Sequence, residues 1–173
     1  MSEMRDAAMQ TLATVGMIVW IGIGATALVG VFNLMGGIKF VSAMITGISD
    51  EPVIVLLFMM ALLFILGMFL DWVGIALLTM PIFVPIIKAL GAQAFGLDSP
   101  EDLVLWFGVL YLVNMQMSFL SPPFGPAAFY LKSVAPPDIS LTDIFRGFLP
   151  FIAIQLVALS LLLIWPPLVS VFL

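Results

Sequence analysis

Long runs of apolar residues, without a regular polar alternation, are the main pattern of this chain. Residues 11–32 carry no charged side chain, and residues 148–171 form a second uncharged apolar run. A helix of about 20 such residues spans a hydrocarbon layer of ~30 Å at 1.5 Å per residue. We therefore predict a transmembrane helix over each of these two ranges.

Two shorter ranges combine apolar residues with charges. Residues 36–48 contain Lys39, and residues 140–147 contain one Asp and one Arg. Short helices of this mixed character lie in the plane of the membrane surface. We predict an interfacial helix over each range, and Ser140 or Thr142 could cap the second one.

Residues 52–88 are too long for one membrane span and too short for two. A single helix would be roughly 50 Å long, whereas two arms of about 15 residues each would fall short of the ~30 Å layer. The segment GMFLD, which contains Gly67 and Asp71, offers the only turn. This favours a re-entrant hairpin whose tip is buried in protein or lines a wet cavity. Two tilted full spans, with Asp71 at a surface turn, are the alternative.

A second discontinuity, SPPFGP, interrupts residues 101–132, which otherwise read as a transmembrane helix. Pro122 and Pro123 lack backbone N–H groups, and their rings obstruct the preceding helical turn. We therefore expect the carbonyls of residues 118–121 to lose their usual donors, and Gly125 to permit a turn that other residues resist. The alternative is a proline kink that neighbouring helices and water molecules satisfy.

Unpaired carbonyls at such a break need a partner, because each costs several kcal/mol in hydrocarbon. A desolvated sodium ion is suitable, since hard cations take carbonyl and hydroxyl oxygens as ligands. The helix that follows the break presents its positive N-terminus to the same place, which suits an anion. Broken helices at mid-depth are typical of transporter binding sites.

Polar side chains near the two breaks are the candidate site residues. Asp71 is a candidate for ion or proton coupling if it lies inside the membrane, and an ordinary solvated residue if it does not. Asn114 and Ser118 share one helical face, whereas Gln116 points elsewhere. They either line a polar cavity or form hydrogen bonds across helices.

Composition supports the membrane class and removes most enzyme chemistry. Of the 173 residues, 64% are hydrophobic and 9% are charged, and the mean hydropathy is +1.29. The chain has no His and no Cys, which removes imidazole bases, thiol chemistry and most zinc sites. One deep carboxylate cannot form the pair that an aspartyl protease needs. The net charge of −5 is spread out and gives no sign of a nucleic-acid partner. We expect no enzyme.

Three stretches, GMFLDWVGIALLTMPIFVPI, NMQMSFLSPPFGPAAFYL and SLTDIFRGFLPF, together resemble the large membrane (DctM-like) subunit of tripartite ATP-independent periplasmic (TRAP) transporters. That subunit is usually much longer and contains two inverted repeats. The resemblance implies that residues 1–173 are a single transmembrane domain from its C-terminal half, present as a fragment, a truncated reading frame or half of a split subunit. The implied fold is an all-α membrane protein, the second inverted repeat of an elevator-type ion transporter.

The resemblance also implies where sodium and substrate bind. Sodium sites are expected at the hairpin tip and at the unwound part of the broken helix. Carried over by position, the sodium ligands are Gly67, Asp71, Ser121 and Gly125, and the wider site adds Thr79, Pro122 and Pro123. The polar helical face of Asn114 and Ser118 completes the list of candidate site residues. No other metal and no cofactor is expected, because sodium acts only as the coupling ion.

The function implied is that of a permease subunit in the bacterial inner membrane, importing organic acids such as dicarboxylates by sodium symport. The expected partners are a small four-helix membrane subunit, a periplasmic substrate-binding protein and the missing N-terminal half of the large subunit. An inactive truncated membrane fragment and a channel subunit with re-entrant loops are the alternatives. The sequence leaves open which organic acid is carried.

Overall fold

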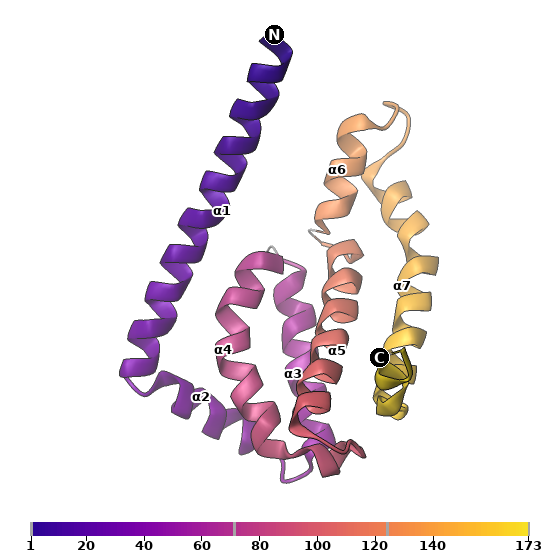
Figure 1. Cartoon of the computed structure of the whole chain (residues 1–173). Helices are drawn as coiled ribbons and strands as arrows, with labels where there is room; N and C mark the ends of the chain where they lie inside the picture. Colours follow the sequence, from indigo (N-terminus) through magenta and orange to yellow (C-terminus); the bar gives the residue numbers. More distant parts are fainter. Residues whose placement is uncertain (1, 71, 124, 173) are drawn as a thin grey trace.

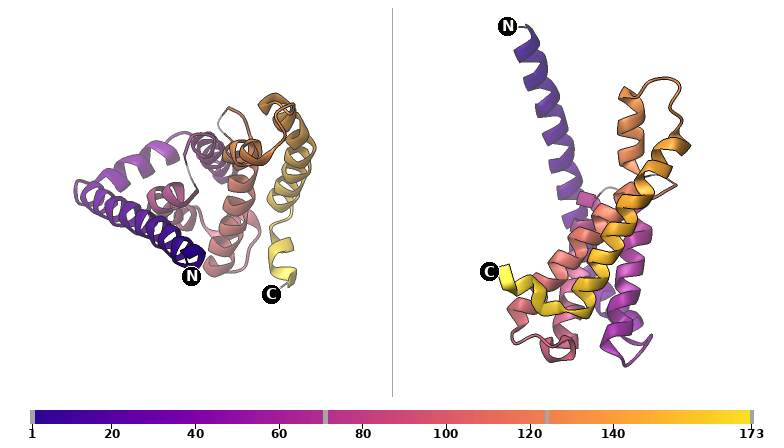
Figure 2. Two further views of the ribbon diagram at one scale, coloured as in Figure 1. Left: turned by 90° about the horizontal axis from the view of Figure 1, so that it is seen from above. Right: turned by 90° about the vertical axis from the view of Figure 1, so that its right-hand side faces the viewer.

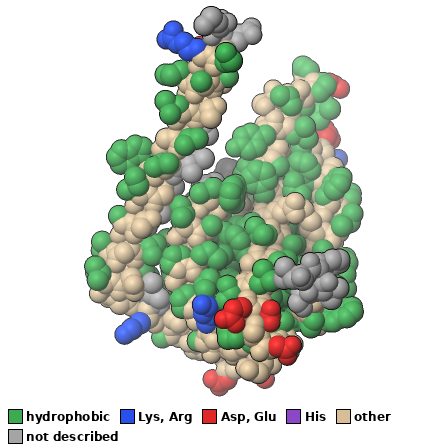
Figure 3. Space-filling view, in the orientation of Figure 1, with side chains coloured by type: hydrophobic (Ala, Val, Ile, Leu, Met, Phe, Trp, Pro, Cys, Tyr) green, Lys and Arg blue, Asp and Glu red, His purple; other side chains and the backbone are tan. Residues whose placement is uncertain are grey.

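The computed structural model describes residues 2–70, 72–123 and 125–172 and shows a bundle of helices (Figure 1). Within these residues the chain forms seven α-helices and two short 3-10 helices and no β-strand. The predicted all-α class is therefore confirmed. Charged side chains gather towards the ends of the molecule, and the surface between them is largely hydrophobic (Figure 3).

Helix α1 (Ser2–Leu34) is longer than the predicted span of residues 11–32, because nothing in the first ten residues breaks a helix. It extends beyond the other helices at its N-terminal end (Figures 1 and 2). A sharp corner then leads into α2 (Gly37–Thr46), and the segments on either side meet at 77°. Gly36 permits the corner through a left-handed φ of 80°.

Helices α3 (Pro52–Gly67) and α4 (Trp72–Leu90) form an antiparallel hairpin (Figure 1). Its arms of 16 and 19 residues correspond to roughly 24 and 28 Å. Two prolines inside α4 do not end the helix, which continues two residues past the predicted range. A short 3-10 helix, η1 (Ala92–Phe95), follows.

Residues 101–132, predicted as one broken transmembrane helix, form two helices, α5 (Pro100–Leu120) and α6 (Pro126–Val134), with an interruption at residues 121–125. Ser99 caps α5, because its Oγ accepts a hydrogen bond of 3.0 Å from the backbone N–H of Asp102. Helix α5 lies at the centre of the bundle and packs against α3, α4 and α7. Its buried side chains include Trp106 and Phe107, each 1% exposed.

The C-terminal segment corrects one prediction. A separate interfacial helix at residues 140–147 and a span at residues 148–171 were expected, but α7 (Leu141–Ile164) is one continuous helix. Ser140 and Asp143 form a capping box that starts this helix, and apolar residues follow without any turn sequence. The helix ends before Pro166, which disfavours helical geometry at the preceding residue. The 3-10 helix η2 (Pro166–Phe172) comes last.

Among the residues that the structure describes, three helices, α4, α5 and α7, are long and apolar enough to cross a membrane, and the bent α1–α2 pair passes the same test as a fourth unit. Helix α3 is apolar but shorter. Only 6% of the most apolar stretch of α7 is buried within the chain, against 50% for α5. The protein is therefore a multi-pass membrane protein in which α5 is the internal helix and α7 is open to its surroundings.

Candidate functional site

Gly67, the last residue of α3, lies against Ser118 of α5. Ser118 is three residues before Ser121, where α5 is interrupted. A Cβ atom built on Gly67 would lie 2.7 Å from the Cβ of Ser118 and closer still to its Oγ. No side chain fits at this contact without displacing the neighbouring helix. The fold thus brings together the two discontinuities that the sequence predicts, one at the end of α3 and one after Leu120.

Four buried polar side chains are found among the described residues: Thr79, Asn114, Ser118 and Ser121, which are 1–4% exposed. All four are predicted site residues. Gln116 is exposed, as expected for a residue on a different face of α5 from Asn114.

Asn114 forms a hydrogen bond across helices. Its Nδ2 donates to the carbonyl oxygen of Met60 on α3, at 2.8 Å. This bond lies within the α3–α5 interface, two turns of helix before the break. Of the two roles predicted for Asn114, the structure therefore shows interhelical bonding for its amide nitrogen.

The hydroxyl groups of Thr79, Ser118 and Ser121 all donate to carbonyl groups of their own helices. The distances are 2.8 Å from Thr79 Oγ1 to Ile75 O, 2.9 Å from Ser118 Oγ to Met115 O, and 2.9 Å from Ser121 Oγ to Met117 O. A hydroxyl that donates its proton keeps two lone pairs. The oxygens of Ser118 and Ser121 can therefore accept a hydrogen bond or bind a hard cation near the break.

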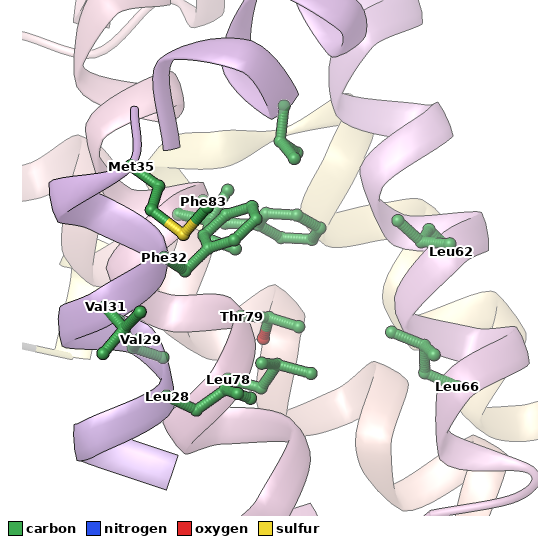
Figure 4. A pocket seen from close by; sticks show the side chains of 12 residues that line it. Leu28, Val29, Val31, Phe32, Met35, Leu62, Leu66, Leu78, Thr79 and Phe83 are labelled. Carbon is green, nitrogen blue, oxygen red and sulfur yellow. The ribbon is translucent and has the colours of Figure 1, made fainter. Parts of the chain in front are cut away.

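Thr79 belongs to a different part of the molecule from these two serines. It lines a cavity of about 470 Å³ between α1, α2 and the hairpin, where its neighbours are hydrophobic (Figure 4). The family resemblance placed Thr79 in the wider site as a residue of the second hairpin arm that could supply a further hydroxyl ligand.

The backbone at the break differs from the prediction. The carbonyls of residues 118–121 were expected to lose their donors, but Ser118 O accepts from Ser121 N at 3.0 Å and Ser121 O accepts from Gly125 N at 3.0 Å. The expectation was wrong for these two carbonyls because the chain turns at once and supplies local donors. Pro122 and Pro123, joined by a cis peptide bond, are exposed.

Gly125 is required at the break for a reason that the sequence does not reveal. Its φ of −36° is not left-handed, so backbone freedom is not the explanation. An added Cβ would instead lie 2.8 Å from Ser121 O and 3.0 Å from the carbonyl carbon of Leu120. The glycine allows α6 to begin directly over the end of α5.

The tip of the hairpin is held by local and interhelical hydrogen bonds. The N–H of Leu70 donates to Leu66 O at 2.9 Å, and the hydroxyl of Tyr111 donates to Trp72 O at 3.3 Å. Trp72 and Tyr111 also line a cavity of about 260 Å³ on the side of α5 that carries Gln116. Asp71, the predicted carboxylate of the tip, lies outside the described residues.

Within the described residues, no group of three His, Cys, Asp or Glu side chains could hold a metal ion. The donors near the break are hydroxyl and carbonyl oxygens instead. Such oxygen ligands suit a hard cation more than a soft transition metal.

The chain is a helical bundle with several apolar helices. The end of one hairpin arm packs against a second helix close to the point where that helix breaks, and buried hydroxyl groups lie near this contact. These are features of a membrane transport protein. The sequence model of the family described as "Tripartite ATP-independent periplasmic transporter, DctM component" matches residues 1–168. The chain belongs to this family, as its motifs predicted; it is a family of transporter permeases, which are not a class of enzymes.

Curated relatives agree with this assignment. The sialic acid TRAP transporter permease protein SiaT of Haemophilus influenzae is 32% identical over 130 residues, which are 75% of this chain and 19% of that protein. The large permease protein SiaM of Vibrio cholerae is 33% identical over 119 residues, 69% of this chain and 25% of that protein. A putative TRAP transporter large permease protein of Haemophilus influenzae is 21% identical over 173 residues, 39% of its own length. The chain thus spans well under half of these relatives.

Proposed function

We propose that the chain forms part of the permease subunit of a sodium-coupled secondary transporter that imports organic acids. Relatives named for sialic acid, 2,3-diketo-L-gulonate and isethionate support this class of substrate, since all three molecules are organic acids. The contact between Gly67 and Ser118 carries the proposal, because it joins the hairpin end to the broken helix.

The proposed sodium site lies between these two elements. Ser121 supplies a buried hydroxyl oxygen whose proton is already donated to Met117 O, and Gly67, Gly125 and Asp71 complete the proposed ligand set. The N-terminus of α6 faces the break, and its partial positive charge favours a carboxylate or sulfonate group of the substrate.

The proposed mechanism is of the elevator type. Sodium binding fixes the hairpin tip against the broken helix and completes the anion site. The loaded unit of α3 to α6 then moves relative to a scaffold that includes α1. Coupling arises because sodium binds the ordered tip more tightly than the open one. In this proposal the hairpin is re-entrant, and the chain is the second of two inverted repeats.

The proposed partners are the remaining, N-terminal half of the large subunit, a small four-helix membrane subunit and a periplasmic binding protein that delivers the substrate. The assembly would lie in the bacterial inner membrane. This chain matches only 19–39% of the length of its relatives. That partial match supports a further half of the large subunit.

Sodium binding can be tested without knowing the substrate. The permease that contains this chain is purified and melted in sodium chloride and in potassium chloride of equal ionic strength. We expect sodium to raise the melting temperature, and Ser121→Ala to shift the sodium dependence to higher concentration because one oxygen ligand is lost.

Ser160→Ala is the matched control for Ser121→Ala. Ser160 Oγ makes the same type of bond to its own helix, 2.8 Å to Leu156 O, but lies exposed on α7. Its removal should leave the sodium dependence unchanged. Equal stabilisation by sodium and potassium, or an unchanged sodium response in Ser121→Ala, would contradict the proposed ion site.

A further inference from the structure

One polar side chain in the interface between α5 and α7 lacks a hydrogen-bond partner. Gln155 lies near the middle of α7, and no other residue in positions 147–164 has a charged or amide side chain. Its Oε1 is buried, and no hydrogen-bond donor reaches this atom within the part of the chain that the structure describes. Among the described residues, Oε1 is the one buried side-chain nitrogen or oxygen in this state.

The position of Gln155 on α7 explains why its oxygen is buried. Leu159 belongs to the hydrophobic core, and Ile152 and Leu162 pack against that core. Because residues three and four apart share one face of a helix, Gln155 lies on the same face as these three. This face packs mainly against α5, which runs beside α7 in the opposite direction (Figure 1).

A hydrogen bond defines which residue of α5 lies opposite Gln155. Trp106 Nε1 donates to Leu162 O at 2.8 Å, so seven residues further along α5, and seven back along α7, place Val113 opposite Gln155. Both steps correspond to about 10 Å along the helix axis. The neighbours of Val113 on this face of α5 are also apolar: Leu110 and Met117. The facing surface of α5 therefore offers no side-chain donor.

The closed interface is costly at Gln155. An acceptor that is buried without a partner loses its hydration and gains no hydrogen bond in return. Compared with an apolar side chain, this loss changes an equilibrium by about five- to 140-fold. Gln155 therefore favours any conformation in which water reaches its oxygen.

The structure of α7 allows such a conformation. Pro150 lies inside α7 and leaves the carbonyl of Arg146 without its usual donor, which weakens the helix about one turn before Gln155. Only 6% of the most apolar stretch of α7 is buried within the chain. The bond to Leu162 holds the helix two turns beyond Gln155. The segment between the proline and this bond can therefore bend away from α5.

We propose that α7 bends away from α5 between Pro150 and Leu162, and that water then enters the interface and donates to Gln155 Oε1. The protein alternates between a closed form, which is the one described above, and an open form that is hydrated near the middle of α7. This inference depends on neither the sodium site nor the substrate.

Thiol reactivity measures this opening in the assembled permease that contains this chain. The chain has no native Cys, so Leu159→Cys is introduced in a permease whose other chains lack cysteines. Position 159 is one turn from Gln155, and Leu159 is 8% exposed. A charged methanethiosulfonate reagent reaches a thiol there only when water enters the interface. We expect slow but measurable modification, because the open form is a minor population.

Gln155→Met removes the unpaired oxygen and keeps the length of the side chain. It should lower the rate of modification about fivefold or more, and it should raise the melting temperature of the permease. Gln116→Met is the matched control, because it removes an exposed amide from α5. It should change neither the rate nor the melting temperature.

Three results would overturn the proposal. An unchanged rate in Gln155→Met would mean that the unpaired oxygen is a static cost of the fold. A lower melting temperature in Gln155→Met would mean that another chain of the permease supplies the donor. No modification at position 159 would mean that the interface stays closed. If Leu159→Cys does not accumulate in membranes, Val113→Cys reports the same opening from the α5 side.

Discussion

Position 67 requires a glycine because Ser118 packs closely against it, and not because of its backbone angles. Gly67 is not among the glycines with positive φ, yet any Cβ at this position would collide with the Ser118 side chain. Gly108 on α5 is different, because a Cβ there would meet nothing within 4 Å. The two glycines therefore respond in opposite ways to the same substitution.

We expect Gly67→Ala to destabilise the protein by about 1–3 kcal/mol, the usual cost of overpacking. Gly108→Ala should instead be neutral or stabilising by up to ~1 kcal/mol, since Ala is the better helix former. Thermal melting of the purified permease measures both. The double variant Gly67→Ala/Ser118→Gly should recover part of the loss, and a Gly67→Ala protein as stable as the unaltered one would show that the contact is not tight.

The amide of Asn114 provides a second prediction at this scale. Asn114→Leu removes the buried hydrogen bond to Met60 O while keeping a similar volume, and should cost about 1 kcal/mol. Gln116→Leu, on the exposed face of the same helix, should have little effect on melting. Equal melting temperatures for the two variants would mean that the bond does not hold α3 against α5.

At the scale of elements, the depth of the α3–α4 tip separates a re-entrant hairpin from two full spans. The chain has no native Cys, so single cysteines report cleanly. We expect Leu70→Cys, at the tip, to react slowly with a membrane-impermeant maleimide, and Gln93→Cys, in the exposed connection after α4, to react fast from one side only. Fast reaction of Leu70→Cys from the opposite side would establish two full spans.

Much of the element pattern could be predicted from the sequence because its signals are local. Pro and Gly residues place the break after Leu120 and the turn after Gly67, since their backbone limits act within one helical turn. The continuous helix α7 was missed because the change from a capping box to apolar residues resembles two helices. A capping signal defines where a helix starts but not how far it continues.

The candidate site was predicted less completely, because its geometry is tertiary. The types of Asn114, Ser118 and Ser121 suggested a polar site, and all three are buried. No sequence signal shows that Asn114 bonds to Met60 or that Ser118 meets Gly67, since these contacts join different helices. The hydrogen bonds that the carbonyls of Ser118 and Ser121 accept depend on the path of the turn. Two adjacent prolines in the sequence do not define that path.

At the scale of the whole molecule, the exposed faces of α1 and α7 define a prediction about assembly. Because the chain covers 19–39% of its relatives, we expect no sodium-dependent uptake when it is produced alone in a bacterial host. Uptake should need the remaining half of a permease, the small subunit and a binding protein. Saturable sodium-dependent uptake by the chain alone would refute this dependence.

The hydrogen bond between Trp106 Nε1 and Leu162 O, at 2.8 Å, holds a fluorescent indole in the interface between α5 and α7. Trp106 is 1% exposed, whereas Trp20, Trp72 and Trp165 are 58–74% exposed. Brominated lipids should quench the emission of the three outer indoles and spare the inner one. The fluorescence that remains comes from the α5–α7 interface. Any opening between α5 and α7 would then be detected as a shift in the wavelength of this emission.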